Sequence, residues 1–338
     1  MSVGIDIGSK TIKVVELGWE GGKPVLKASG IVGVKDASID RIQDEGEMAT
    51  LANTIKGLFR DAKISSKEVS IALPETQVFT RSLKFPTLTD QEIASAVKWQ
   101  AEEVIPIPAK EAIFQHMIIE RRENAVPPEV LVLVVAAPRA LIEKYMKILT
   151  MAGLTVTGVE TELLALSRAV APVGQTVLVA DFGAKSTDIG IAKNEKLVFS
   201  RTIPTAGDAF TRAIAQTMGI NPVQAEEYKK TYGLSGTQMQ GKVAGAISPI
   251  FKIVVEEIKK AIHFYQTDEK GESPNLVILS GGTAGLPEAS PQLAKLLGIE
   301  VVIANPFAKV SVSPEIAQNI ANYAPLYSIA VGLALRGG

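Results

Sequence analysis

Two stretches far apart in the sequence share one pattern of residues. Residues 3–15 read VGIDIGSKTIKVV, and residues 178–191 read LVADFGAKSTDIGI. Each pattern predicts a short strand that ends in Asp-x-Gly, a turn with a small residue and a lysine, and then a second strand. Because the copies lie about half a chain apart, they indicate a duplicated half-molecule rather than a solenoid of short repeats. We therefore expect an α/β fold with two similar halves.

Composition excludes several classes of protein and site. The chain has 338 residues, enough for roughly two to three domains. It has no cysteine, which excludes a disulfide scaffold, a thiolate zinc site, an iron–sulfur cluster and a cysteine nucleophile. Its two histidines, His116 and His263, are too few for a multi-histidine metal site. The net charge of −1, without a basic run, argues against nucleic acid as a partner.

Nothing in the sequence predicts a membrane span or a signal peptide. The longest apolar run, residues 130–137, is far shorter than the ~20 residues of a spanning helix. The N-terminus begins directly with an apolar strand and lacks the basic region of a signal peptide. We therefore expect a cytoplasmic protein.

A different module lies between the two repeated stretches, at residues 78–153. Its pattern predicts a strand, a helix, two strands and a second helix. Thr89 and Glu92 form a capping box at the start of the first helix. The strand at residues 130–137 is apolar at every position, which predicts that both of its faces are buried.

Three loops carry residues suited to binding a nucleotide. Asp6 and Asp181 each follow a predicted strand at a glycine turn, and Ser280-Gly281-Gly282-Thr283 follows a late strand. Tight turns of small residues expose backbone N–H groups, which bind phosphate oxygens. The aspartates cannot bind phosphate themselves but can hold a hydrated Mg²⁺. Hydroxyl donors lie close to both aspartates, at Ser9, Thr11, Ser186 and Thr187.

This set of motifs resembles the superfamily of actin, Hsp70 and sugar-kinase ATPases, in the expected order and over nearly the whole chain. Six stretches carry the resemblance: the first phosphate loop (4–11), two connecting segments (158–161 and 330–334), the second phosphate loop (181–188), the Glu-x-x-Lys helix that contacts adenosine (225–229) and the adenosine loop (279–286).

The resemblance implies an actin-like fold of two ribonuclease H-like lobes that bind ATP between them. The module at 78–153 lies where the division protein FtsA and its relatives carry a subdomain called 1C. The predicted division is 1A (1–77, 154–172 and 322–338), 1C (78–153), 2A (173–205 and 272–321) and 2B (206–271).

Within the superfamily the chain is most similar to the PilM family of type IV pilus assembly. Three stretches carry this similarity: residues 3–17, 92–108 and 129–166. The family implies an ATP-binding scaffold in the cytoplasm, at the inner face of the inner membrane. Its partner is the N-terminal cytoplasmic tail of the inner-membrane protein PilN, docked near 1A and 1C. Pilus motor ATPases are further candidate partners, and the family permits self-association.

The resemblance also assigns roles to single residues. It places Mg²⁺, through water, at Asp6 and Asp181, and a water-orienting acid at Glu160. The residues assigned to ATP are Gly8, Ser9, Lys10, Thr11, Gly183, Ala184, Lys185, Gly207, Glu226, Lys229, Gly281, Gly282 and Thr283. Two departures from the superfamily pattern predict slow turnover or none: Lys185 replaces a usual glycine, and Thr161 replaces a proline common beside the acid.

Several residues have a plainer alternative interpretation. Either aspartate alone also fits a turn-capping role. Glu226 and Lys229 also fit an ordinary surface pair on a helix, and Glu160 also fits structural hydrogen bonding. Trp99 lies off the apolar stripe of its helix, so it either packs within the 78–153 module or helps to form the partner site.

Two other functions compete with the pilus scaffold. An FtsA-like division actin would polymerise at the membrane, and such proteins usually carry an amphipathic helix after the last core helix. A sugar kinase or an Hsp70 would need a catalytic aspartate or a substrate domain. Asp208 is the available aspartate, but its place at the start of a predicted helix favours a role as the N-cap or as a residue on the phosphate side.

Overall fold

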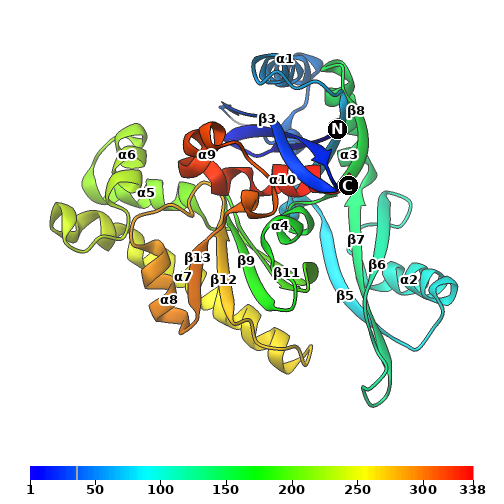
Figure 1. Ribbon diagram of the computed structural model, residues 1–338. Helices are drawn as coiled ribbons and strands as arrows, with labels where there is room; N and C mark the ends of the chain where they lie inside the picture. The colour runs from blue at the N-terminus through cyan, green and yellow to red at the C-terminus, as the bar shows by residue number, and fades with distance from the viewer. Residues whose placement is uncertain (36, 338) are drawn as a thin grey trace.

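Two five-stranded sheets of the same connectivity form the centre of the molecule, as the computed structural model shows (Figure 1). The structure describes residues 1–35 and 37–337, without the side chains of residues 101 and 102. The first sheet has the order β3-β2-β1-β4-β8 and the second β11-β10-β9-β12-β13. In this order, the first three strands of each sheet pair antiparallel with their neighbours, and each of the last two strands is parallel to the strand before it. The expected duplication is therefore confirmed.

The strands have the following bounds. The first sheet contains β1 (Ser2–Ile7), β2 (Thr11–Glu20), β3 (Lys23–Gly33), β4 (Glu68–Leu73) and β8 (Thr155–Thr161). The second sheet contains β9 (Thr176–Phe182), β10 (Thr187–Lys193), β11 (Lys196–Ile203), β12 (Leu276–Ser280) and β13 (Glu300–Ile303). A third, antiparallel sheet has the order β5-β7-β6, with β5 (Phe79–Pro86), β6 (Ala112–Arg122) and β7 (Glu129–Pro138).

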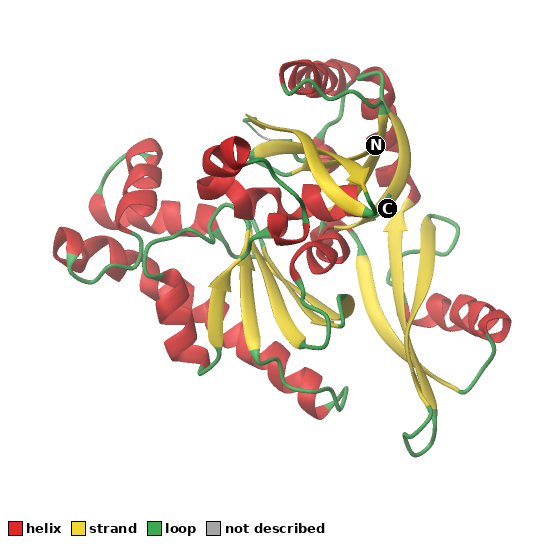
Figure 2. Cartoon of the chain, viewed as in Figure 1, coloured by secondary structure: helices red, strands yellow, loops and turns green. Residues whose placement is uncertain are grey.

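Helices surround the sheets (Figure 2). The helices are α1 (Glu45–Asp61), α2 (Asp90–Val104), α3 (Arg139–Met151), α4 (Glu162–Val170), α5 (Gly207–Met218), α6 (Pro222–Tyr232), α7 (Lys242–Thr267), α8 (Ala289–Leu297), α9 (Pro314–Ile320) and α10 (Ser328–Leu335). The short 3₁₀ helices η2 (Glu75–Gln77) and η5 (Ala321–Tyr327) also matter below. In the described part of the chain, no helix has both the length and the apolar character needed to cross a membrane.

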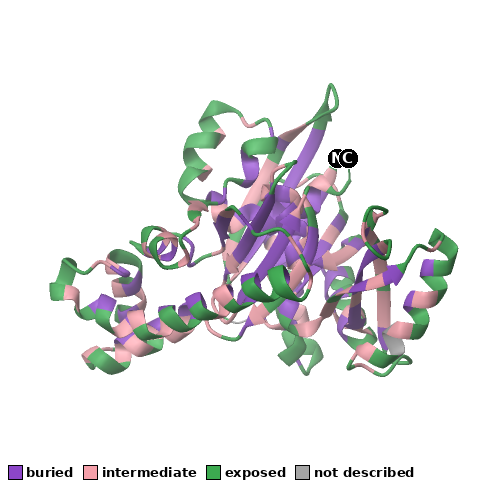
Figure 3. Ribbon diagram, turned by 90° about the horizontal axis from the view of Figure 1, so that it is seen from below, coloured by how far each residue is buried: buried purple, intermediate pink, exposed green. Residues whose placement is uncertain are grey.

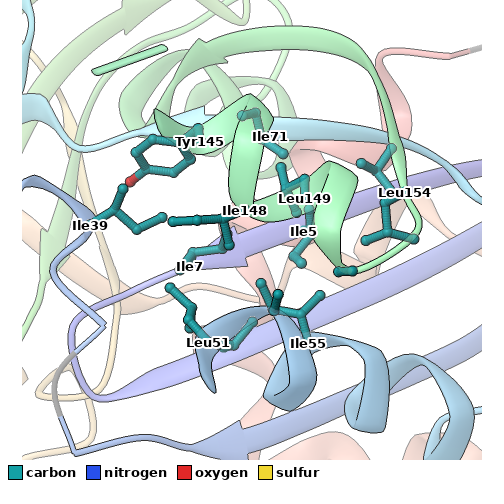
Figure 4. Close-up of a cluster of buried hydrophobic side chains, with 14 of the residues drawn as sticks. Ile5, Ile7, Ile39, Leu51, Ile55, Ile71, Tyr145, Ile148, Leu149 and Leu154 are labelled. Atoms are coloured by element: carbon teal, nitrogen blue, oxygen red, sulfur yellow. The ribbon is translucent and has the colours of Figure 1, made fainter. Parts of the chain in front are cut away.

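The core of the first lobe lies between its sheet and two helices. Ile5 of β1, Ile55 of α1 and Ile148 of α3 are fully buried there and belong to one cluster (Figure 4). The residues of α3 fall in the range expected for 1C, but the helix packs on the first sheet together with α1. The division into four subdomains stays a prediction, and this packing ties α3 to the first lobe.

The β5-β7-β6 sheet and α2 form a separate module, called the bridging module below. At the start of α2, Glu92 accepts from the Thr89 N–H and Thr89 accepts from the Glu92 N–H, which confirms the capping box. Strand β7 is buried on both faces, as predicted. Its residues Val130, Val132 and Val134 pack with α2, whereas Leu131 and Leu133 pack with the second sheet.

Helices α4 and α10 connect the two lobes and cross at very close range. A Cβ atom on Gly332 of α10 would lie 1.9 Å from the carbonyl oxygen of Ala165 in α4. A Cβ on Gly4 of β1 would lie 2.1 Å from the oxygen of Ala330. Only glycine permits this approach of backbone to backbone. Strands near the middle of the molecule are largely buried, while the outer helices are largely exposed (Figure 3).

Gly332→Ala is expected to lower the free energy of unfolding by at least about 2 kcal/mol, because the new methyl group must push α10 away from α4. Gly57→Ala is the matched control: Gly57 also lies inside a helix, and nothing is within 4 Å of its added Cβ. That control should gain about 0.5–1 kcal/mol from helix propensity. Urea denaturation measures both, and equal stability of the two variants would contradict the close crossing.

Candidate functional site

A cleft of about 1270 Å³ lies between the two lobes and brings together residues far apart in the sequence. Its walls come from the β1–β2 and β9–β10 turns, the loop after β12, and parts of η2, α5, α6 and η5. These predicted residues line it: Asp6, Gly8, Ser9, Lys10, Thr11, Asp181, Gly183, Ala184, Lys185, Glu226, Lys229, Gly281, Gly282 and Thr283. The duplicated turns therefore face one cavity.

The first turn holds a buried ion pair that the sequence analysis missed. Lys13 Nζ donates to Asp6 Oδ2 at 2.9 Å, and both side chains are buried. Burial alone would lower the pKa of Lys13, but the charge and hydrogen bond of Asp6, with the charges of Asp181 and Glu162, raise it. The signal was present in the pattern, because Lys13 lies directly opposite Asp6 in the antiparallel register of β1 and β2.

The second turn places two carboxylates opposite each other. Asp181 of β9 and Asp188 of β10 are register partners. Asp188 accepts hydrogen bonds from Ser186 at 2.8 Å and from Thr202 at 2.6 Å. Burial, with the charges of Asp188 and Asp6, raises the pKa of Asp181 from 3.8 to about 7. Asp181 is therefore a carboxylate whose negative charge its surroundings do not balance.

Two glutamates extend this acidic group, and the sequence analysis did not predict either of them. Glu162, the first residue of α4, lines the cleft. Burial, followed by the charges of Asp188, Asp6 and Asp181, raises its pKa well above the ordinary value. Glu75 of η2 accepts from the Leu163 N–H at 2.9 Å, and burial raises its pKa to about 7. Only the three-dimensional fold brings these acids to the aspartates.

The residues present fit a hydrated divalent cation. Lys13 offsets only part of the negative charge of Asp6, Asp181, Asp188 and Glu162, and a cation would offset more of it. Among the described residues, no three acidic, histidine or cysteine side chains converge closely enough to hold a metal ion directly. This geometry suits Mg²⁺, which keeps several waters and takes few protein carboxylates. Asp6 and Asp181 would hold such an ion through water.

A hydrogen-bonded network joins α5 and α6 at the second-lobe wall of the cleft. Buried Lys229 donates to the Gly207 oxygen at 3.1 Å, to Thr211 at 3.0 Å and to Glu226 at 2.7 Å. Burial would raise the pKa of Glu226, but the hydrogen bonds that it accepts from Lys229 and Thr211 lower its pKa below the ordinary value. Gly207 lies against Thr283, whose Oγ1 would be 2.7 Å from an added Cβ. Glu226 and Lys229 thus belong to a partly buried hydrogen-bonded network and do not form an isolated pair on the surface.

The lysines of the two duplicated turns each reach the opposite lobe. Lys10 in the first turn lies 3.5 Å from Asp208 at the start of α5. Lys185 in the second turn donates to Ser38 of the first lobe at 2.7 Å. Both contacts cross the cleft, so the relative position of the lobes determines whether they form.

Glu160 and Trp99 lie apart from the cleft. Both carboxylate oxygens of Glu160 accept from Arg168, at 2.6 and 2.7 Å, and Arg168 also donates to the Gly332 oxygen at 2.7 Å. This geometry matches the structural interpretation of Glu160, and the water-orienting role stays a prediction without support from its position. Trp99 lies on the outer side of α2 and is 78% exposed, so it does not pack within the bridging module.

Comparison with known proteins identifies the family. The model of a family described as type IV pilus assembly protein PilM matches residues 4–338. The chain belongs to the PilM family. A solved chain of a PilM-PilN type IV pilus biogenesis complex is 28% identical, with a TM-score of 0.84 over 99% of this chain and 98% of that one.

More distant relatives share the fold. Cell division protein FtsA of Streptococcus pneumoniae is 24% identical over 88% of this chain and 74% of its own length. MreB5 of Spiroplasma citri bound to AMPPNP is 12% identical, with a TM-score of 0.55 over 98% of this chain and 93% of that one. The resemblance to the actin-like superfamily and the PilM family is thereby confirmed, and this PilM-family protein has the two-lobed actin-like ATPase fold.

Asp181→Asn is expected to stabilise the protein at pH 8 and to change its stability little at pH 4. A carboxyl whose pKa is raised from 3.8 to about 7 in the folded state stabilises the fold fully below about pH 4. That stabilisation is lost as the pH rises through 7, when the buried group must ionise. We expect a gain of about 2 kcal/mol at pH 8, measured by urea denaturation without metal or nucleotide.

Asp208→Asn is the matched control for Asp181→Asn, because Asp208 lines the same cleft but is partly exposed and lies near Lys10. Its effect should stay below about 1 kcal/mol at both pH values. If Asp181→Asn changes the free energy of unfolding equally at pH 4 and pH 8, the surroundings of Asp181 do balance the negative charge of its carboxylate.

Proposed function

We propose that this protein is an ATP-binding scaffold of type IV pilus assembly that docks the N-terminal cytoplasmic tail of a PilN-like inner-membrane protein. One observation carries the proposal. The chain belongs to the PilM family and is similar over almost its whole length to a chain of a solved PilM-PilN complex, and it has the two facing Asp-x-Gly turns of a nucleotide cleft. The family model covers nearly all of the chain, so we do not propose the FtsA-like alternative.

The cleft offers separate regions to the parts of Mg·ATP. The glycine turns at Gly8 and Gly183, with Lys13 between the lobes, suit the phosphates. Mg²⁺ supplies charge neutralisation there and would be held through water by Asp6 and Asp181. The Glu226–Lys229 network and the loop at Gly281, Gly282 and Thr283 suit the nucleoside, because they combine polar side chains with small residues that allow close approach.

The acidic groups around the cleft favour binding over rapid hydrolysis. Glu160 is held by Arg168 and faces away from the cleft. Burial and the charges of Asp188, Asp6 and Asp181 raise the pKa of Glu162 well above its ordinary value, so these surroundings disfavour the ionised form that would accept a proton from water. We therefore propose slow turnover at most.

The bridging module carries a row with two half-buried aromatic residues suited to a peptide. Phe79 of β5, Ala136 of β7 and Phe114 of β6 are register partners on one face of the sheet. Helix α2 covers the other end of this face, where it packs on Leu83 and Phe85. Phe79 and Phe114 are half-buried and flank Ala136, which is itself fully buried. We call Phe79, Ala136 and Phe114 the docking row.

Polar residues flank the docking row and suit an extended tail. Arg81, Val134 and His116 form the next row on the same face, since side chains alternate along a strand. Arg81 is exposed and can pair with an acidic group of the tail. Docking a membrane protein's tail here would hold the scaffold at the cytoplasmic face of the inner membrane. Pilus motor ATPases and further copies of the chain stay candidate partners.

Lys229→Met is expected to weaken ATP binding at least about tenfold, because it removes three hydrogen bonds and the positive charge that join α5 and α6 at the nucleoside wall. Lys259→Met is the control, since Lys259 pairs with Glu256 on α7, outside the cleft. Titration with a fluorescent ATP analogue in Mg²⁺ measures both. If Lys229→Met keeps its fold and binds the ATP analogue as tightly as the parent, the nucleoside does not bind at this wall.

Phe79→Ala and Phe114→Ala are each expected to weaken binding of a PilN-tail peptide at least about tenfold, because each removes one wall of the docking row. Phe264→Ala is a control: this ring is 41% exposed but lies on α7. Fluorescence polarisation of the labelled peptide gives the affinities. Trp99→Ala tests the other candidate partner residue; parent-like binding would exclude Trp99, and parent-like binding of both row variants would exclude the docking row.

A further inference from the structure

A second cavity, of about 290 Å³, adjoins the nucleotide cleft at the start of α5. Lys185, Asp208 and Arg212 line both spaces, so they belong to the wall that the two spaces share. The rest of the lining comes from Arg41 of the first lobe and from residues 204–206 and 209 of the second lobe. Arg41 is not among the described residues that line the cleft. We call this cavity the second pocket.

Positive charge is in excess around the second pocket. Among the described residues that line it, Arg41, Lys185 and Arg212 are basic, and Asp208 is acidic. Asp208 also lies 3.5 Å from Lys10, which offsets part of its negative charge. Cations gathered around one cavity repel one another, and an anion placed between them is attracted by all of them. The second pocket therefore favours an anionic ligand.

Two of the basic side chains have donors that no neighbour uses. Arg41 and Arg212 are both exposed, and neither guanidinium group has a hydrogen-bond or ion-pair partner within the part of the chain that the structure describes. Each guanidinium presents several N–H donors in a planar fork, which matches the spacing of phosphate oxygens. This chemistry favours an oxyanion such as phosphate over a monatomic anion such as chloride.

The backbone that carries Arg41 is fixed on the first lobe. Arg41 is the last residue of the short 3₁₀ helix η1 (Ile39–Arg41). Ile39 and Ile42, on either side of it, are buried in the first-lobe core. Lys144 of α3 also donates to the Ile42 oxygen at 2.8 Å. The Arg41 side chain therefore extends toward the second pocket from a rigid base.

The opposite wall of the second pocket is fixed on the second lobe. Arg212 lies on α5, which Phe210 and Ile214 anchor in the second-lobe core. The N–H groups of Gly207 and Asp208, at the start of α5, donate to carbonyl oxygens of the β9–β10 turn at 3.2 and 2.8 Å. Because these N–H groups are already used, the basic side chains are the groups that can hold an anion here.

We propose that the second pocket is a binding site for inorganic phosphate, held between Arg41 of the first lobe and Arg212 of the second, with Lys185 adding positive charge. This site is separate from the site of the ATP phosphates, because Arg41 lines the second pocket and is not among the described residues of the cleft. A phosphate bound there accepts hydrogen bonds from both lobes and so joins them. The inference does not depend on the proposed function, because it requires neither a nucleotide nor a peptide.

The first test titrates phosphate into the protein by calorimetry. The cleft is first saturated with Mg²⁺ and a non-hydrolysable ATP analogue, and sodium chloride keeps the ionic strength constant. We expect one phosphate per chain, and Arg41→Gln should weaken its binding at least about tenfold, because charge-assisted hydrogen bonds are lost. Arg60→Gln is the matched control, since Arg60 is an exposed arginine that pairs with Asp61 on α1. No binding to the parent, or equal weakening in the two variants, would overturn the proposal.

The second test separates the second pocket from the nucleotide site. Arg41→Gln should bind a fluorescent ATP analogue as tightly as the parent does. If Arg41→Gln weakens binding of the analogue as much as it weakens binding of phosphate, the second pocket is part of the nucleotide site and the proposal is wrong. If the analogue does not bind even to the parent, the proposed nucleotide binding fails. Phosphate titration of the nucleotide-free parent and of Arg41→Gln then still decides the second pocket.

The third test distinguishes two sources of the phosphate, the solution and ATP cleaved in the adjoining cleft. The protein is incubated with Mg²⁺ and ATP labelled in the γ-phosphate, and free ligand is removed by rapid gel filtration. Labelled phosphate retained by the parent and lost from Arg41→Gln would identify ATP as a source. No retention, together with binding of added phosphate in the first test, would identify the solution. Equal retention by the parent and Arg41→Gln would contradict a phosphate site at Arg41.

Discussion

The repulsion among buried carboxylates of the two lobes is the constraint on which the rest of the structure depends. Asp6 comes from one sheet and Asp181 and Asp188 from the other, and the charges of Asp188 and Asp6 add to burial in raising the pKa of Asp181. Lys13 offsets part of this charge through its ion pair with Asp6. The two duplicated sheets hold these groups together at the cleft.

The sequence predicts these aspartates well because their positions depend on local structure. An apolar strand that ends in Asp-x-Gly places the carboxylate at the end of the strand, and the duplication places two such ends in equivalent positions. Lys13 was within reach of the same reasoning, since it follows from the hairpin register. Glu75 and Glu162 were not, because η2 and the start of α4 meet only in the folded chain.

Side-chain direction explains what the sequence could not determine. Glu160 precedes Glu162 by only two residues, but in β8 it is held by Arg168, while Glu162 at the start of α4 lines the cleft. Trp99 was correctly placed off the apolar stripe of its helix, yet only the structure shows that no other element covers it. Likewise α3 follows the module in sequence but packs beside α1, where its buried residues belong to the first-lobe core.

Contacts across the cleft and the helix crossing beside it hold the two lobes together. Lys10 and Lys185 each contact the opposite lobe, Lys10 at Asp208 and Lys185 at Ser38. At the crossing, the absence of a side chain on Gly332 lets the backbones of α10 and α4 meet, because an added Cβ would lie 1.9 Å from the Ala165 oxygen. The carboxylates of both lobes are therefore held near one another by backbone packing as well as by side-chain contacts across the cleft.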